Sequence, residues 1–285
     1  MRRTLGRVTV DPLLALADLP GVRAAVDDAR SACEQLRWHE AFRRRWREVR
    51  AESGIRASGA SARLEGAQVS LDRVRELAVG AAPSGGDEAL VRGTLRTHVV
   101  VETLMPDLGA RSTPPLPPFP QLLATLHRAA TAGWLDPDAV GRLRSRGSPE
   151  DLHGLGAAPP ASDVAARLDL LGRTVDSSRA PALVIAAVAH GELMMLRPFA
   201  AGNGTVARAL FRLLLTRGGL DPTGCAVADE EWSSAPHPYL AAAAQFATGS
   251  PDGVATWLRA CAGAVGAGAV RATSVADAVR AGRLG

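Results

Sequence analysis

A short loop that ends at Arg208, "LRPFAAGNGTVAR", combines residue types that bind an anion. Gly202-Asn203-Gly204 allows the backbone to turn with positive φ, and successive amides in such a turn form an anion-binding nest. The helix predicted to follow adds its N-terminal dipole and free N–H groups, and Arg208 lies one turn into that helix. The sequence therefore predicts a phosphate-binding loop, with Arg197 as a second cation at its start.

A longer pattern surrounds this loop. From His190 to Arg208 the chain reads H-x-x-L-x-x-x-R-P-F-x-x-G-N-G-x-x-x-R. This resembles the core motif of Fic-domain proteins, HPFxxGNGRxxR, in which an acidic residue stands just before the first Gly. Upstream, "SARLEG" from Ser61 to Gly66 resembles the family's inhibitory-helix motif. In that family the motif Glu pairs with the second motif Arg and blocks productive ATP binding, so the resemblance implies a contact between Glu65 and Arg208.

What the resemblance implies about activity depends on three positions. Active Fic proteins transfer AMP from ATP to a hydroxyl of a target protein, with the motif His as general base and the acidic residue as the Mg²⁺ ligand. Here Arg197 replaces the His, and its guanidinium stays protonated. Ala201 replaces the acid and offers no oxygen to a metal, and Thr205 replaces the first motif Arg. We expect ordinary AMP transfer to be lost, because losing a general base alone costs about 10²–10⁴-fold.

Four interpretations of the loop remain open at this point. Arg197 and Arg208 give the loop two positive charges and no negative one, which favours binding of ATP, another nucleotide or phosphate without Mg²⁺. The second interpretation is a decayed loop, with Arg197 facing solvent or paired with the inhibitory Glu65. The third is residual or divergent nucleotidyl or phosphoryl transfer. The fourth is a protein-interaction module that ignores nucleotide and uses the Pro-rich segment or the Arg cluster "FRRRWREVR".

Other positions near the motifs have structural interpretations. His190 lies on an apolar helix, where a buried, hydrogen-bonded His is favoured over a substitute base. Glu192 does not share a helix face with it, and we expect this Glu to be solvated. Ser61 is of a type that favours a helix N-cap. The segment 141–160, where the family has a hairpin that docks the target, lacks alternating β-formers, which argues against such docking here.

The elements that position the loop are predicted to be helices. The composition is 47% hydrophobic but only 4% aromatic, so the core is expected to be mostly Ala, Leu and Val. The predicted fold class is all-α, a Fic-type helical bundle with an N-terminal helical extension. We expect an N-terminal helical region over 1–111 that carries the motif at 61–66, a Pro-rich linker over 112–120, a Fic core over 121–265 with its motif loop at 197–208, and an Ala/Gly-rich tail over 266–285 that is prone to fray. The linker contains PxxP, which we interpret as a stiff spacer in preference to an SH3-type ligand.

Composition also limits the class of partner. The net charge is +4, but basic and acidic residues interleave, so no nucleic-acid partner is expected. Cys33, Cys225 and Cys261 lie far apart, which argues against a disulfide framework or a zinc site. From the sequence, no apolar run is expected to reach the length of a membrane span and no signal-peptide core stands at the N-terminus, so we expect a cytoplasmic protein without a membrane partner. The expected partner is a protein, and the family resemblance is compatible with a homodimer.

Overall fold

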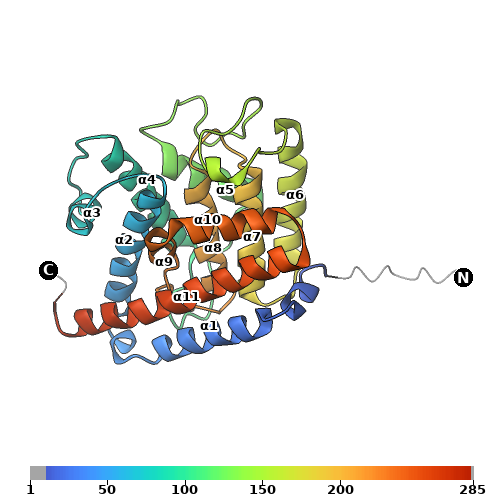
Figure 1. Cartoon of the computed structure of the whole chain (residues 1–285). Coiled ribbons are helices and arrows are strands. Elements are labelled where there is room, and N and C mark those ends of the chain that lie inside the picture. The colour runs from blue at the N-terminus through green and yellow to red at the C-terminus, as the bar shows by residue number, and fades with distance from the viewer. Residues whose placement is uncertain (1–10, 284–285) are drawn as a thin grey trace, which may run out of the picture.

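The computed structural model describes residues 11–283, which form an all-helical molecule with no strand in that range (Figure 1). The predicted all-α class is therefore confirmed. The α-helices are α1 (Val22–Arg37), α2 (Trp46–Leu64), α3 (Leu71–Ala78), α4 (Gly86–Leu104), α5 (Phe119–Thr131), α6 (Ala161–Ser177), α7 (Ala182–Leu196), α8 (Asn203–Arg217), α9 (Asp229–Ser234), α10 (Pro236–Ala247) and α11 (Pro251–Arg280). Short 3-10 helices are η1 (Leu14–Asp18), η2 (Glu40–Arg43) and η3 (His153–Leu155).

Helix α7 is the centre of the fold. Its sequence "ALVIAAVAHGELMML" has no polar face, and 12 of its 15 residues are buried, as expected for a helix that is surrounded on all sides. It packs against α8, α11, α10 and α6. Arg197 follows its last turn with a left-handed backbone, so the helix ends and the chain turns at the start of the motif loop.

Helices α1 and α11 lie side by side along one side of the molecule (Figure 1). Gly21 before α1 faces Arg259, and His39 after α1 bonds to Asp277, so the two helices run parallel. Helix α11 continues to Arg280, and six of the residues in its second half are buried, so up to that residue the Ala/Gly-rich tail is a packed helix rather than a frayed end. Small residues permit this, because a Cβ at Gly268 would lie 2.5 Å from the carbonyl oxygen of Val227.

Helix α11 also bears on the expected absence of a membrane-length apolar run. By length and composition Pro251–Arg280 is apolar enough to cross a membrane, with a mean hydropathy of 1.2 in its best window, so that expectation is wrong for this helix. However, 61% of the window is buried inside the molecule, where α11 packs against α1, α10 and α7. This burial is typical of a core helix.

Helix α2 connects the N-terminal region to the motif. It runs without a break from Trp46 to Leu64 and packs against α4, α9 and α11. Ser61 therefore lies inside the helix and is not the N-cap that its residue type suggested, because the small residues before it continue the helix into the core. A second small core joins the end of α2 to α3 and α4; its buried members are Ala62, Ala67, Val74, Leu77 and Val91.

The Pro-rich segment is a loop that is held against the helices. It ends at Pro118, two residues earlier than expected, because α5 starts at Phe119 and accommodates Pro120 in its first turn. Arg217 of α8 donates from Nη1 to the carbonyl oxygen of Pro114 at 2.7 Å. This contact agrees with a structural linker.

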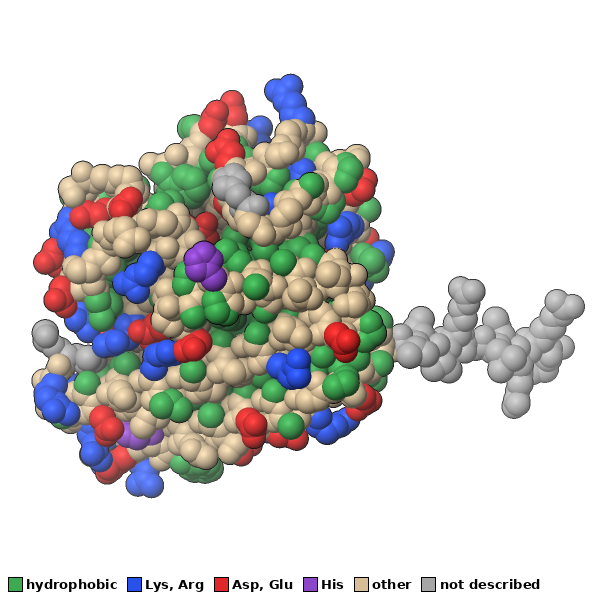
Figure 2. Space-filling model, viewed as in Figure 1, with side chains coloured by type: hydrophobic (Ala, Val, Ile, Leu, Met, Phe, Trp, Pro, Cys, Tyr) green, Lys and Arg blue, Asp and Glu red, His purple; other side chains and the backbone are tan. Residues whose placement is uncertain are grey.

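Charged side chains of both signs are scattered over the face of the molecule drawn in Figure 2. Ion pairs such as Arg280–Glu40 and Arg271–Glu231 join elements across the surface. Basic side chains on this face do not gather into a continuous stripe of the kind that follows a nucleic-acid backbone.

Gly93 allows α4 to approach α5 closely. A Cβ at this position would collide with the carbonyl oxygen of Ala130, so we expect Gly93→Ala to lower the free energy of unfolding by about 1–3 kcal/mol through overpacking. Urea titration measures this change. Gly263→Ala in α11 is the control, because nothing lies within 4 Å of the added Cβ; there the better helix propensity of Ala should raise the free energy of unfolding by about 0.5–1 kcal/mol. Equal stabilities for the two variants would contradict the close contact.

Candidate functional site

The motif loop joins α7 to α8 through two left-handed residues. Arg197 has φ 42° and Gly202 has φ 77°, and α8 begins directly after Gly202. A Cβ at Gly202 would lie 2.7 Å from Cγ2 of Thr131 on α5, so both the backbone and the space favour glycine. The backbone N–H groups from Asn203 onward stand at the N-terminus of a 15-residue helix, where the helix dipole attracts an anion.

His127 of α5 fixes the loop from behind. Its buried ring stacks on Phe199 with the ring centroids 3.9 Å apart. Nδ1 accepts a hydrogen bond from the amide of Gly141 at 2.8 Å, so Nε2 carries the proton and donates to the carbonyl oxygen of Ala201 at 2.9 Å. Burial is the main cause that lowers the pKa of His127 to about 4, so the ring is neutral at physiological pH.

A carboxylate from the segment 141–160 stands at the N-terminus of α8. Oδ2 of Asp151 accepts a hydrogen bond from the backbone N–H of Asn203 at 2.6 Å, and Oδ1 accepts from Nδ2 of the same residue at 2.7 Å. Asn203 is only 1% exposed, and its side chain is held by the backbone N–H and carbonyl of Phe199. The anion in this nest is therefore Asp151, which the sequence alone did not single out.

The electrostatic setting of Asp151 contains opposing influences. A helix N-terminus and two hydrogen bonds ordinarily lower the pKa of a carboxyl group. Here desolvation by burial, followed by the negative charge of Glu65, raises the pKa of Asp151 to about 6. Glu65 and Asp151 therefore lie close enough to repel each other across the start of α8.

Arg208 is buried against the end of α2. Its Nε donates to Oγ of Ser61 at 2.8 Å, and its Nη2 donates to the carbonyl oxygen of Ser61 at 3.2 Å and to Oε1 of Glu65. Asp229 of α9 lies 3.7 Å from Nε. Burial by itself lowers the pKa of the guanidinium, but Glu65, followed by Tyr239 and Asp229, outweighs burial, and the pKa of Arg208 is raised.

One nitrogen of Arg208 has no hydrogen-bond partner within the described part of the chain. This nitrogen, Nη1, is buried, and a Cβ on Gly204 would lie 2.9 Å from it. Oε1 of Glu65 faces the same point of α8. The void beside Arg208 has a volume of about 30 Å³, which is room for about one water molecule. An unused donor is therefore available at the first turn of α8.

Arg197 points toward the segment that carries Asp151. Its side chain is buried, Nη1 donates to the carbonyl oxygen of Leu152 at 3.2 Å, and Nη2 donates to that of Gly156 at 2.8 Å. The two orientations expected for a decayed loop are thus not observed, because Arg197 does not face solvent and Glu65 pairs with Arg208. Arg144 adds a further bond, from its Nε to the carbonyl oxygen of Arg197 at 2.7 Å. These arginines hold the segment 141–160 against the motif loop.

The motif loop and the helices on either side of it belong to a known family. Residues 117–215 match the model of the Fic/DOC family. The chain contains a Fic domain. No curated protein matches the sequence.

Solved Fic structures share the fold well beyond that domain. A Fic family protein from Desulfovibrio desulfuricans has a TM-score of 0.72 at 21% identity, covering 90% of this chain and 74% of its own. Fic-1 from C. elegans has a TM-score of 0.68 at 20% identity, with coverage of 92% and 73%. A Fic domain containing signaling protein from Bacteroides thetaiotaomicron has a TM-score of 0.65 at 18% identity, with coverage of 89% and 98%.

Around the Fic motif the structure brings together most of the residues that the sequence singled out. The nest residues and Arg208 form one site, and Ser61 and Glu65 reach it from α2, just before Gly66 turns the chain with φ 102°. Ala201 and Thr205 are buried beside it. The missed residue is Asp151. A signal for it existed, because Glu150 and Asp151 are the only acids in the segment 141–160.

His190 and Glu192 have the structural roles of ordinary helix residues. His190 is fully buried, and its Nε2 lies 2.9 Å from the hydroxyl of Tyr239. Its ring meets Trp232 and Trp257 edge-on, which agrees with a structural role. Glu192 is half-buried and accepts a hydrogen bond from Arg167 at 2.9 Å, so it is less solvated than expected.

We expect the titration of Asp151 to lower stability as the pH rises. Its folded pKa of about 6 lies above the ordinary Asp value of about 3.9, so the folded protein binds more protons than the unfolded chain between these values. The stabilising contribution is therefore complete below about pH 4 and is lost as the pH rises through about 6. In urea titrations, the free energy of unfolding of wild type minus that of Asp151→Asn should decrease across this range.

Asp138→Asn is the control for this experiment, because Asp138 is an exposed acid and makes no ion pair with a described residue. Its difference from wild type should stay nearly constant with pH. If the Asp151→Asn difference instead increases with pH, the hydrogen bonds and the helix dipole hold the pKa of Asp151 below its ordinary value.

Proposed function

We propose that this Fic-domain protein is a pseudoenzyme that binds the phosphates of ATP or another nucleotide at the start of α8 and does not transfer AMP. The observation that carries the proposal is Arg197, which stands at the sequence position of the motif base. Its guanidinium is buried and committed to two backbone carbonyls. A guanidinium stays protonated, so it cannot take a proton from a target hydroxyl.

The start of α8 supports phosphate binding. The site already holds one carboxylate, Asp151, on the amide of Asn203, so its geometry accepts an anion there. Arg208 contributes a buried guanidinium with one unused donor beside Gly204. Helix amides and an arginine are the groups that proteins use to hold phosphate oxygens.

The donor set around the nest does not fit Mg²⁺. Ala201 contributes no side-chain oxygen, both oxygens of Asp151 accept hydrogen bonds from Asn203, and Glu65 is paired with Arg208. Within residues 11–283 no group of three His, Cys, Asp or Glu side chains could hold a metal ion. We therefore propose that nucleotide binds without Mg²⁺, with the positive charge coming from Arg208 and the helix terminus.

Two internal carboxylates compete with the proposed nucleotide. A phosphate in the nest must displace Asp151 from Asn203, and it gains Arg208 only when Glu65 withdraws. Nucleotide binding would then move the end of α2 and the segment 141–160 together. We propose that a protein partner senses this change at the surface, which would make the chain a nucleotide-responsive regulator.

Removal of either internal carboxylate should strengthen nucleotide binding. In calorimetric titrations of ATP in EDTA, we expect Glu65→Gln and Asp151→Asn each to lower the Kd by about tenfold or more, since a hydrogen bond to a charged group is worth about 1.5–3 kcal/mol. Glu48→Gln is the matched control, because this glutamate lies on the same helix and pairs with Arg45 away from the nest. Binding that requires Mg²⁺, or no binding by any of the proteins, would contradict the proposal.

Wild-type protein should transfer no AMP from labelled ATP to itself or to a general protein substrate. In a Glu65→Gly background, the combined substitutions Arg197→His, Ala201→Asp and Thr205→Arg restore the family motif and should raise self-modification by about 10²-fold or more. The Glu65→Gly protein without the other three changes is the control. Transfer by wild type at the rate of the restored variant would overturn the assignment as a pseudoenzyme.

A further inference from the structure

A second cavity lies between α2, α3 and α4, away from the start of α8. Its volume is about 690 Å³, which is in the range of small-molecule sites. Successive turns of α2 and α4 form its two long walls, and the end of α3 contributes the third. No part of the proposed nucleotide site lines it.

The cavity walls are mainly apolar. Ile55 of α2, Leu77 of α3 and Leu95 of α4 line its interior. Val99 borders it and is 61% exposed, so the apolar surface continues to the mouth. Such walls favour a ligand with an apolar body.

Lining residues at the two ends of the cavity set its extent. Ala78 and Gly80 border it at the end of α3, and Trp46 and Asp107 border it at the far side. Along α4 the lining extends over 12 residues, from 92 to 103, and the first and last of them are about 16 Å apart at 1.5 Å per step. A cavity of this length and volume suits one small molecule. A partner helix would be longer than the cavity.

Part of the charge on the lining is neutralised within the protein. Arg47 pairs with Asp107 at 2.7 Å, and Arg50 lies 3.8 Å from Glu102. Arg47 and Arg50 also lie over the ring of Trp46, with their guanidinium carbons 4.4 and 4.7 Å from its centroid. These two arginines are therefore already occupied.

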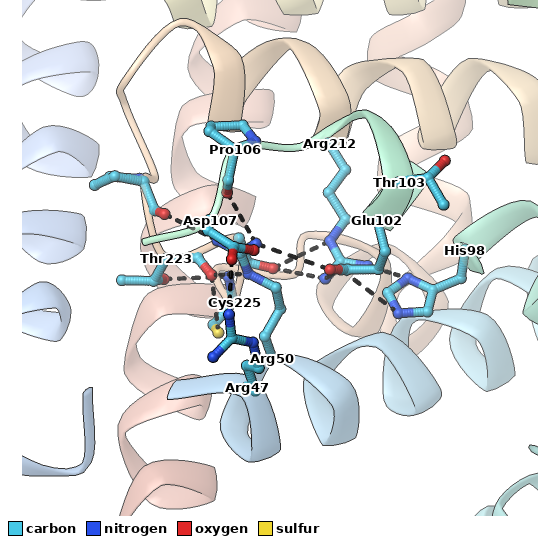
Figure 3. A network of polar contacts seen from close by, with 12 residues as sticks. Arg47, Arg50, His98, Glu102, Thr103, Pro106, Asp107, Arg212, Thr223 and Cys225 are labelled. Atoms are coloured by element: carbon cyan, nitrogen blue, oxygen red, sulfur yellow. Dashed lines mark hydrogen bonds and ion pairs between the residues drawn. The ribbon is translucent and has the colours of Figure 1, made fainter. Parts of the chain in front are cut away.

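Figure 3 shows that Arg50, His98 and Glu102 of the lining also take part in a network of polar contacts. Arg50 donates to the carbonyl oxygen of Thr223 at 2.6 Å, and Arg212 of α8 donates to Oε1 of Glu102 at 3.3 Å. Nδ1 of His98 faces Arg212 at 2.5 Å. Desolvation, followed by Arg212 and Arg50, holds the pKa of His98 well below its usual value, so the ring is neutral.

Two arginines on the lining remain without an acidic partner among the described residues. Arg92 and Arg96 are one helical turn apart on α4, where like charges repel. Arg96 donates to the carbonyl oxygens of Ala129 and Ala132 at the C-terminal end of α5, whose helix dipole offsets part of its charge, and no carboxylate among the described residues pairs with it. Desolvation and then Arg92 lower the pKa of Arg96, which is the effect expected of an unrelieved positive pair.

We propose that this cavity binds a single amphipathic anion from solution, an apolar body with one carboxylate, whose charge is held by Arg92 and Arg96. The carboxylate relieves the repulsion between the two guanidinium groups and accepts their N–H groups. The apolar body lies along the walls toward Val99. The ligand is a dissolved small molecule, and this site functions independently of nucleotide binding at α8.

Calorimetric titration of decanoate into the full chain tests the proposal. We expect saturable binding with a stoichiometry of one, and no saturable binding of decyltrimethylammonium, which has the same chain and the opposite charge. The double substitution Arg92→Gln, Arg96→Gln should weaken decanoate binding by about tenfold or more. Val99→Trp, at an exposed position that leaves the core intact, should also weaken it by filling the mouth.

The matched control is Arg142→Gln, Arg146→Gln, which removes two exposed arginines at the same spacing outside the cavity. Its decanoate affinity should equal that of wild type. Circular dichroism and the Tm establish that each variant is folded. Equal affinity for the anion and the cation, an undiminished affinity in the Arg92/Arg96 variant, or no saturable decanoate binding would each overturn the proposal.

Discussion

A positive charge buried at the junction of three helices constrains the whole molecule. An unpaired buried charge costs about 3–5 kcal/mol, so the guanidinium of Arg208 must keep anionic or polar partners. Ser61 and Glu65 supply them from α2 and Asp229 supplies another from α9, which ties the N-terminal helices to the Fic domain. If Glu65 leaves, Ser61 and Asp229 remain beside Arg208, and a further anion would restore the lost pairing. The phosphate of the nucleotide proposed above would be such an anion.

Asp151, the second anion of the site, is brought to α8 indirectly, through hydrogen bonds to the backbone of its segment. Asp151 reaches α8 because Arg197 and Arg144 hold its segment by backbone carbonyls. Arg197 is therefore used here to position a loop. Its guanidinium provides the donors that fix the segment over the nest.

Much of this site could be predicted from the sequence because its signals are local. The glycines and the start of α8 follow from backbone geometry, and the contact of Glu65 with Arg208 follows from two motifs. The sequence offered Asp151 only as one of two acids in its segment; its place at α8 could not be predicted, since carbonyl oxygens hold that segment and every residue type presents the same carbonyl. Ser61 was expected to cap a helix and the Ala/Gly-rich tail was expected to fray. Ser61 and the tail up to Arg280 instead lie within packed helices, because small residues allow close contact between helices. The cavity between α2, α3 and α4 left no signal, because its walls come from three separate segments.

All the basic residues of this chain are arginines, and several of them bond to the backbone rather than to acids. Arg50 holds the carbonyls of Thr223, Pro106 and Pro222, while Arg212 and Arg217 hold loops beside α8. A lysine in these places would begin to lose its proton near pH 10 and could be acylated, whereas a guanidinium keeps its charge and resists amine-directed reagents. The hydrogen bonds that hold the loops around the Fic core should therefore persist in alkaline solution and after exhaustive amine labelling. Loops held by lysine side chains would lose these bonds under the same conditions.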